Sequence, residues 1–83
     1  MNYTALDIVH FWADSREKLI QSVLPSNGRI YVCCTVDLNR EAAKVCSFIS
    51  LVVKRPWTFQ TKIENEQFVI EFFPETVTLE NLF

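Results

Sequence analysis

The sequence predicts a two-layer α+β domain, in which helices cover one face of a mostly antiparallel sheet of three or four strands. Two amphipathic helical segments, one before residue 25 and one after residue 37, flank a run of alternating apolar residues. Two further alternating runs, from residue 57 onward, have the spacing of a β-hairpin. The expected order is helix, strand, helix, strand, strand. We expect a single domain over residues 1–83, because so short a chain cannot build two cores.

The first helical segment begins after Thr4, whose hydroxyl suits an N-cap, and extends to Pro25. Its apolar residues recur at helical spacing on one face: Ala5, Ile8, Val9, Trp12, Leu19, Ile20 and Val23. Asp14 and Glu17 have the spacing of a second capping box. A break into two helices near residue 14 is therefore an open alternative.

A strand over residues 29–36 follows the turn that contains Gly28, the only glycine. One face of this strand is apolar and comprises Ile30, Val32, Cys34 and Val36. A second helix is then expected, with Asp37 or Asn39 as its cap and Pro56 as its stop. Its buried stripe is expected to comprise Leu38, Ala42, Val45, Ile49 and Val52.

The remaining chain predicts a hairpin that folds about Asn65 and Glu66. The expected register pairs Ile63 with Phe68, Thr61 with Ile70, and Phe59 with Phe72. This register gathers the large apolar residues on one face, as a half-buried sheet requires, and leaves the other face open. Residues 77–83 form a short apolar tail whose structure the pattern leaves open.

Charge is unevenly distributed, although the net charge is only −2. Residues 29–62 hold six basic side chains against Asp37 and Glu41, whereas residues 63–83 hold five glutamates and no base. The chain is therefore expected to have a basic side and an acidic side. Such an asymmetry either steers a partner or is an ordinary solvated surface.

The cysteines and the absence of targeting signals predict a cytoplasmic location. Three cysteines are an odd number, and the adjacent Cys33 and Cys34 would point to opposite faces of a strand, so no disulfide is expected. The first residues lack the basic region of a signal peptide. The longest apolar candidate, residues 45–53, is too short to span a bilayer, so no membrane partner is expected.

The sequence also argues against catalysis and against a bound cofactor or metal. One glycine cannot build a phosphate-binding loop of the known types. The soft metal ligands, Cys33, Cys34, Cys46 and His10, have no metal-site spacing. A thiol nucleophile would need Cys33 beside His10, and we expect these residues on opposite sides of the sheet. We therefore expect no enzyme, no cofactor and no metal site.

Apolar residues that the expected fold does not bury indicate a partner-binding surface. Phe11 falls on the polar side of the first helix. If exposed apolar residues cluster, they mark an interface, unless residues 77–83 fold over them. The expected apolar contacts to a partner are Tyr31, Phe48, Leu51, Val69 and Phe73. The expected acidic contacts are Glu64, Glu66 and Glu71.

In length, single-domain build, acidic pI near 5.2 and lack of catalytic motifs, the chain is similar to the small accessory proteins of phages and mobile elements, including anti-CRISPR inhibitors. This resemblance is one of general character, assigns no residue, and implies inhibition by masking a partner protein. We expect a non-enzymatic protein-binding module that acts as a homodimer. The alternative is a small nucleic-acid-binding or regulatory protein that uses Arg40, Lys44, Lys54 and Arg55, although the acidic pI is the reverse of what such a protein needs.

Overall fold

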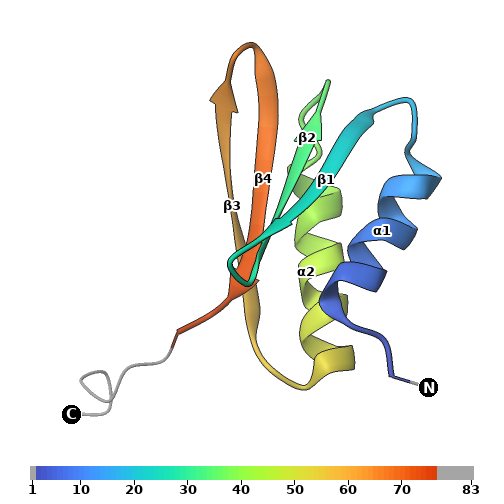
Figure 1. Cartoon of the computed structure of the whole chain (residues 1–83), viewed down its shortest axis with the longest axis vertical. Helices are drawn as coiled ribbons and strands as arrows, with labels where there is room; N and C mark the ends of the chain where they lie inside the picture. Colours follow the sequence, from blue (N-terminus) through green and yellow to red (C-terminus); the bar gives the residue numbers. More distant parts are fainter. Residues whose placement is uncertain (1, 77–83) are drawn as a thin grey trace.

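The computed structural model describes residues 2–76 and confirms the expected α+β fold class. Two helices pack on one side of a four-stranded sheet (Figure 1). The elements in chain order are α1 (Ala5–Ser15), β1 (Ile20–Ser26), β2 (Arg29–Cys34), α2 (Asn39–Val53), β3 (Trp57–Glu64) and β4 (Gln67–Pro74). Residues 77–83, which include Glu80, lie outside the described residues. The alternative that this tail folds over a set of exposed apolar residues falls on the same segment.

The main correction concerns residues 20–26, which form strand β1 where a continuing helix was expected. The observed order is therefore α-β-β-α-β-β. Asn27 and Gly28 explain the difference, because their φ angles of 53° and 77° form the left-handed two-residue turn that joins antiparallel strands. Pairing with β2 outweighs the helical spacing of the apolar residues. Pro25 is tolerated because β1 lies at the sheet edge.

The sheet has the order β1-β2-β4-β3, and every neighbouring pair is antiparallel. The predicted register of the second hairpin is confirmed at all three pairs, Ile63 with Phe68, Thr61 with Ile70, and Phe59 with Phe72. Its turn is also as expected, since Asn65 and Glu66 both have positive φ. The central strands β2 and β4 therefore present alternate residues to the helices.

The core lies between the sheet and the helix layer. Its largest fully buried side chains are Val9, Val32, Cys34, Ile49, Ile70 and Phe72. Trp12 of α1 packs edge-on against Phe72 of β4, with 6.1 Å between ring centroids. The expected stripe of α2 also faces this core, with Ala42 and Ile49 fully buried. Helix α1 therefore contacts the sheet through one aromatic pair as well as through its aliphatic residues.

The helix ends follow the sequence only in part. Thr4 caps α1 as expected, and Asp7 completes a capping box, with each backbone N–H bonded to the other's side chain. The cap of α2 is Leu38 rather than Asp37 or Asn39; the Asp37 carboxylate instead accepts the Asn39 N–H at 2.9 Å. Strand β2 also ends at Cys34, two residues before the expected end.

Candidate protein-binding surfaces

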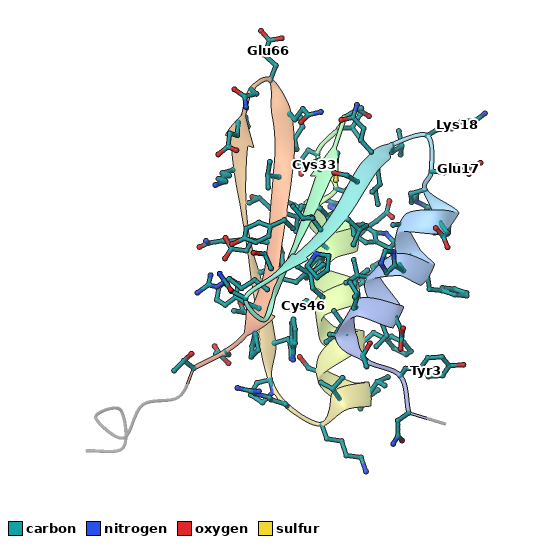
Figure 2. The ribbon with its side chains drawn as sticks, viewed as in Figure 1. Tyr3, Glu17, Lys18, Cys33, Cys46 and Glu66 are labelled. Atoms are coloured by element: carbon teal, nitrogen blue, oxygen red, sulfur yellow. The ribbon has the colours of Figure 1, made fainter. Side chains whose placement is uncertain are left out.

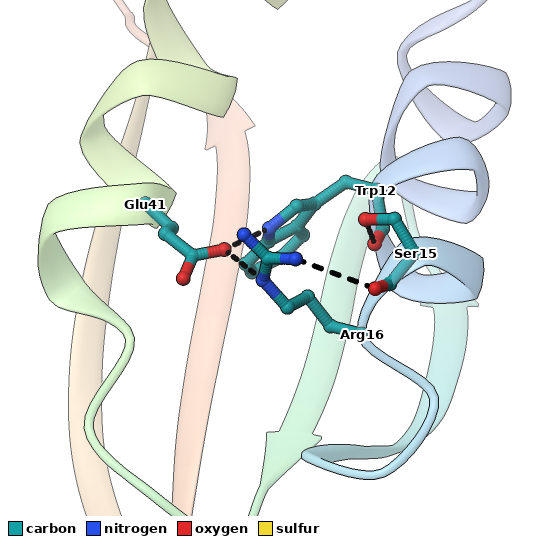
Figure 3. Close-up of polar contacts among 4 residues, drawn as sticks. All are labelled: Trp12, Ser15, Arg16 and Glu41. Atoms are coloured by element: carbon teal, nitrogen blue, oxygen red, sulfur yellow. Dashed lines mark hydrogen bonds and ion pairs between the residues drawn. The ribbon is translucent and has the colours of Figure 1, made fainter.

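Helices α1 and α2 lie side by side and run antiparallel (Figure 1). At one end of the pair, the indole N–H of Trp12 and the Nε–H of Arg16 both donate to Oε1 of Glu41 at 2.9 Å (Figure 3). The bond from Trp12 is the main cause that lowers the pKa of Glu41, and the bond from Arg16 adds to it. The ionised carboxylate therefore holds the two helices together.

An apolar groove of about 460 Å³, here called the helix groove, opens between the outer sides of these helices. Its lining residues are Tyr3, Asp7, Ile8, Phe11, Trp12, Lys44, Val45, Phe48 and Val52. The exposed fraction is 82% for Phe11 and 54% for Phe48, so both rings reach solvent. Leu51, 73% exposed, lines an adjoining depression with Phe48 and Lys44.

Most of the exposed large apolar residues gather at this one place. Seven such side chains occur among residues 2–76, and four of them, Tyr3, Phe11, Phe48 and Leu51, lie in or beside the helix groove. The other three are Leu24 on β1, Val36 after β2 and Ile63 on β3. Single exposed apolar residues are ordinary, whereas a cluster of this kind is typical of an interaction surface.

The two helices that form the groove carry opposite charge. Helix α1 has Asp7 and Asp14 exposed and contains no lysine or arginine. Hydrogen bonds from Thr4 lower the pKa of Asp7 and so favour its ionised form. Helix α2 has Arg40 and Lys44 exposed, while its own Glu41 is already bonded to α1. The helix groove therefore lies between an acidic helix and a basic helix, here called its two walls, and of these four charged residues Asp7 and Lys44 line the groove itself.

The sheet face away from the helices, here called the open sheet face, is a second candidate. It carries Tyr31, Val69 and Phe73, as expected, together with Leu24, which pairs with Tyr31 across β1 and β2. Tyr31 and Phe73 are only half-buried, whereas Val69 is 7% exposed. Neighbouring strands therefore already cover Val69, and this face offers less apolar surface than the sequence suggested.

Glu71 lies at the centre of the open sheet face and is also only 7% exposed. Its carboxylate accepts hydrogen bonds from Arg29 and from Nε2 of Gln60, and the bond from Arg29 is the main cause of its lowered pKa. The Arg29 guanidinium also stacks 4.6 Å from the centroid of the Phe73 ring. Glu71 is thus engaged within the chain, with little surface left for a partner.

The other expected acidic contacts lie elsewhere. Glu66 stands at the tip of the β3–β4 hairpin, at the opposite end of the molecule from Tyr3 (Figure 2). Glu64 is next to this tip and pairs with Lys62 at 3.1 Å, which also raises the pKa of Lys62. The predicted contact residues are therefore distributed over the helix layer, the open sheet face and the hairpin tip.

The expected nucleic-acid-binding residues are also divided. Arg40 and Lys44 are exposed near the start of α2, whereas Lys54 and Arg55 follow its last turn. Lys54 follows Arg40 by fourteen residues, which corresponds to a distance of about 20 Å along the helix at the α-helical rise. They form two pairs at the two ends of α2 rather than one basic patch.

The thiols occupy two different environments. Cys34 is fully buried, and its burial raises the pKa of its thiol to about 11. Burial also raises the pKa of Cys46, whose Sγ lies 3.0 Å from the carbonyl oxygen of Trp57. Cys33 is half-buried on the open sheet face, and His10 is exposed on α1. Helix α1 covers the other face of the sheet (Figure 1). These two residues are therefore not brought together.

Two structural features are absent from residues 2–76. No group of three or more histidine, cysteine, aspartate or glutamate side chains converges as metal ligands would in this part of the chain. Neither of its helices combines the length and apolar character needed to cross a membrane.

Sequence reasoning did not include Tyr3 and Phe11 in the expected contact set. The position of Phe11 off the apolar stripe of α1 was a usable signal, but its meeting with Phe48 depends on the packing of two helices. No protein-family model matches this chain, and no curated protein or solved structure matches it. Support for a function therefore comes from the described surfaces themselves.

Proposed function

We propose that this chain is a non-enzymatic protein-binding module whose main contact surface is the helix groove. The observation that carries the proposal is the clustering of Tyr3, Phe11, Phe48 and Leu51 on one side of the molecule. Exposed apolar surface is costly in water, and its burial against a second protein is favourable by about 25 cal/mol per Å². Aromatic side chains at the centre of a contact are the usual source of affinity.

The proposed mode of action is masking of a partner's surface. The groove walls carry charged residues beside an apolar floor, and such charges set orientation and on-rate while the apolar side chains supply affinity. The general resemblance to phage accessory proteins extends this proposal to inhibition, with a host defence protein as the class of target. Its support is the chain's length, single-domain build and acidic pI.

A protein partner is favoured over nucleic acid by the surroundings of the basic residues. Arg40 and Lys44 share the helix layer with Asp7 and Asp14, which would repel a phosphate backbone. Exposed apolar residues also lie between Lys44 and the basic residues at the end of α2. This surface fits a mixed apolar and charged protein contact better than a polyanion.

The test is affinity capture from an extract of the source cells, with mass spectrometry of the retained proteins. The groove variant Phe11→Gln/Leu51→Gln removes two exposed apolar side chains and keeps good helix formers. The matched control, Leu24→Gln, makes the same change at a residue that is 61% exposed on the open sheet face. We expect wild type and control to retain the same protein and the groove variant to lose it.

Retention that depends on Leu24 instead, or that is equal for all three baits, would contradict the proposal. A nuclease treatment that releases the retained material, together with loss of retention in Arg40→Glu/Lys44→Glu, would favour the nucleic-acid alternative.

A further inference from the structure

We infer that the helix groove is occupied by a second copy of this chain, with α1 of each copy lying over α2 of the other. This inference rests on the proposed function, because it names the partner of the same groove. It is carried by the charge difference between the two groove walls, and by the antiparallel arrangement of the two helices.

The charge pattern is self-complementary. Only acidic residues are charged on α1, at Asp7 and Asp14, whereas the exposed charges of α2 are Arg40 and Lys44. A two-fold axis parallel to the groove places each acidic wall over the basic wall of the partner copy. In such an isologous contact, every favourable charge pair occurs twice.

The positions along the helices also match. Arg16 and Trp12 are bonded to Glu41, so Asp14 lies at the level of the first turn of α2, where Arg40 is found. At the other end, Tyr3 and Val52 line the same cavity. Under the two-fold axis Asp14 of one copy lies at the level of Arg40 of the other, and both lie beside the groove rather than in its lining.

The next turn of the groove gives the second charged pair and the apolar centre. Phe11 lines the groove with Lys44 and Phe48, and Asp7 lies one turn before Phe11. A second copy thus brings Asp7 within one helical turn of Lys44 and sets Phe11 over the exposed side chains of α2. The two most exposed apolar residues of the helix layer, Phe11 and Leu51, both lie within this contact, at different levels of α2.

A single foreign helix suits this groove less well. A uniformly acidic helix is repelled by the α1 wall, and a uniformly basic helix is repelled by the α2 wall. A second copy satisfies both walls at once, because it supplies one helix of each charge. In the resulting dimer the groove is closed to other proteins, and the open sheet face is the surface that remains exposed to one.

Sedimentation equilibrium between about 1 and 100 µM tests the inference directly. We expect wild type and Leu24→Gln to approach twice the chain mass of 9.7 kDa. Phe11→Gln/Leu51→Gln is expected to remain a monomer with an unchanged circular dichroism spectrum. A monomeric wild type over this range, or a dimer lost in Leu24→Gln and kept in the groove variant, overturns the inference.

A charge exchange gives an independent readout that a general loss of stability would not produce. Asp7→Lys/Asp14→Lys and Arg40→Glu/Lys44→Glu are each expected to weaken self-association on the order of 10- to 100-fold, because like charges then face each other. An equimolar mixture of the two variants restores both attractive walls, so it is expected to form a heterodimer. Two dimeric variants, or a mixture that stays monomeric, overturn the inference.

These results separate the inference from the proposed function. A monomeric wild type whose capture of another protein depends on Phe11 and Leu51 rejects the second copy and retains the protein-binding groove. If the chain is a monomer and its capture of another protein does not depend on Phe11 and Leu51, both the inference and the proposed function are rejected.

Discussion

Trp12 donates its indole N–H to Oε1 of Glu41 at 2.9 Å, and this bond joins α1 to α2 at one end of the helix groove. The same oxygen accepts the Nε–H of Arg16 at 2.9 Å, from just beyond the end of α1 (Figure 3). One half-buried carboxylate therefore links three parts of the helix layer. Because the groove exists only between these helices, its shape depends on this contact.

Replacement of Glu41 is expected to lower the stability of the fold. Glu41→Gln retains an acceptor for Trp12 but removes the charge that strengthens both bonds, so we expect a loss of about 1 kcal/mol in the free energy of unfolding at neutral pH. Urea unfolding followed by circular dichroism measures this loss. Glu66→Gln, at the exposed hairpin tip, is the control and is expected to match wild type; an equal loss in both variants would contradict the role of Glu41.

Acid is expected to destabilise the protein through two carboxylates. Hydrogen bonds lower the pKa of Glu41 and Glu71 in the folded chain below the ordinary value of 4.5, so the unfolded chain binds protons first as the pH falls. Their stabilisation is complete above that value and is lost as the pH falls through the folded pKa values. Urea midpoints measured between about pH 6 and pH 3 should fall less in Glu41→Gln/Glu71→Gln than in wild type. If the urea midpoints of the two proteins depend identically on pH, Glu41 and Glu71 are not the cause of the acid destabilisation.

Thiol labelling should distinguish one cysteine from the other two. Cys33 is half-buried, whereas Cys34 and Cys46 are buried with raised pKa values, about 11 for Cys34. We expect a disulfide reagent at neutral pH to modify Cys33 first, and the buried thiols only as the protein unfolds. The Cys33→Ser variant provides the control, since it should lose the early phase. Three thiols reacting at one rate would show that this core is not closed as described.

The β1–β2 turn should be sensitive to a side chain at Gly28. Its φ is +77°, and a Cβ placed there meets no atom within 4 Å, so the cost of Gly28→Ala is conformational alone. We expect a loss of about 1–2 kcal/mol, the penalty for a left-handed residue with a Cβ. Ser26→Ala, an exposed change in the same hairpin, serves as the comparison. A Gly28→Ala protein as stable as the comparison would argue against this turn.

The elements that the sequence predicted correctly are those whose pattern depends on local chain geometry. The register of the β3–β4 hairpin follows from alternation on both strands and a two-residue turn, and each predicted pair is present. The capping box at Thr4 is likewise local. In contrast, residues 20–26 have helical spacing, and only their pairing with β2 makes them a strand. This pairing is also local, because the two-residue Asn27-Gly28 turn joins β1 to β2, so the helical spacing of the apolar residues obscured a hairpin signal that the sequence contained.

The candidate site was predicted only in part for a related reason. Phe48 and Leu51 were expected as contacts, because they lie off the buried stripe of α2. Their proximity to Phe11 and Tyr3 results from the packing of two helices, which no pattern within either helix contains. Burial of Glu71 likewise depends on Arg29 and Gln60 from two neighbouring strands. A sequence pattern identifies the face of a helix or strand on which a residue lies, but not the other helices or strands against which that face packs.

The central claim, that protein covers the helix groove, is tested most directly by hydroxyl-radical footprinting with the whole chain as probe. Oxidation rates of Phe11, Phe48 and Leu51 are compared between the dilute isolated protein and the protein in source-cell extract or at high concentration. The account predicts that these three rates fall while those of Leu24 and Ile63, which are exposed elsewhere, stay constant. Unchanged rates at the groove, or protection confined to Leu24 and Ile63, would contradict it.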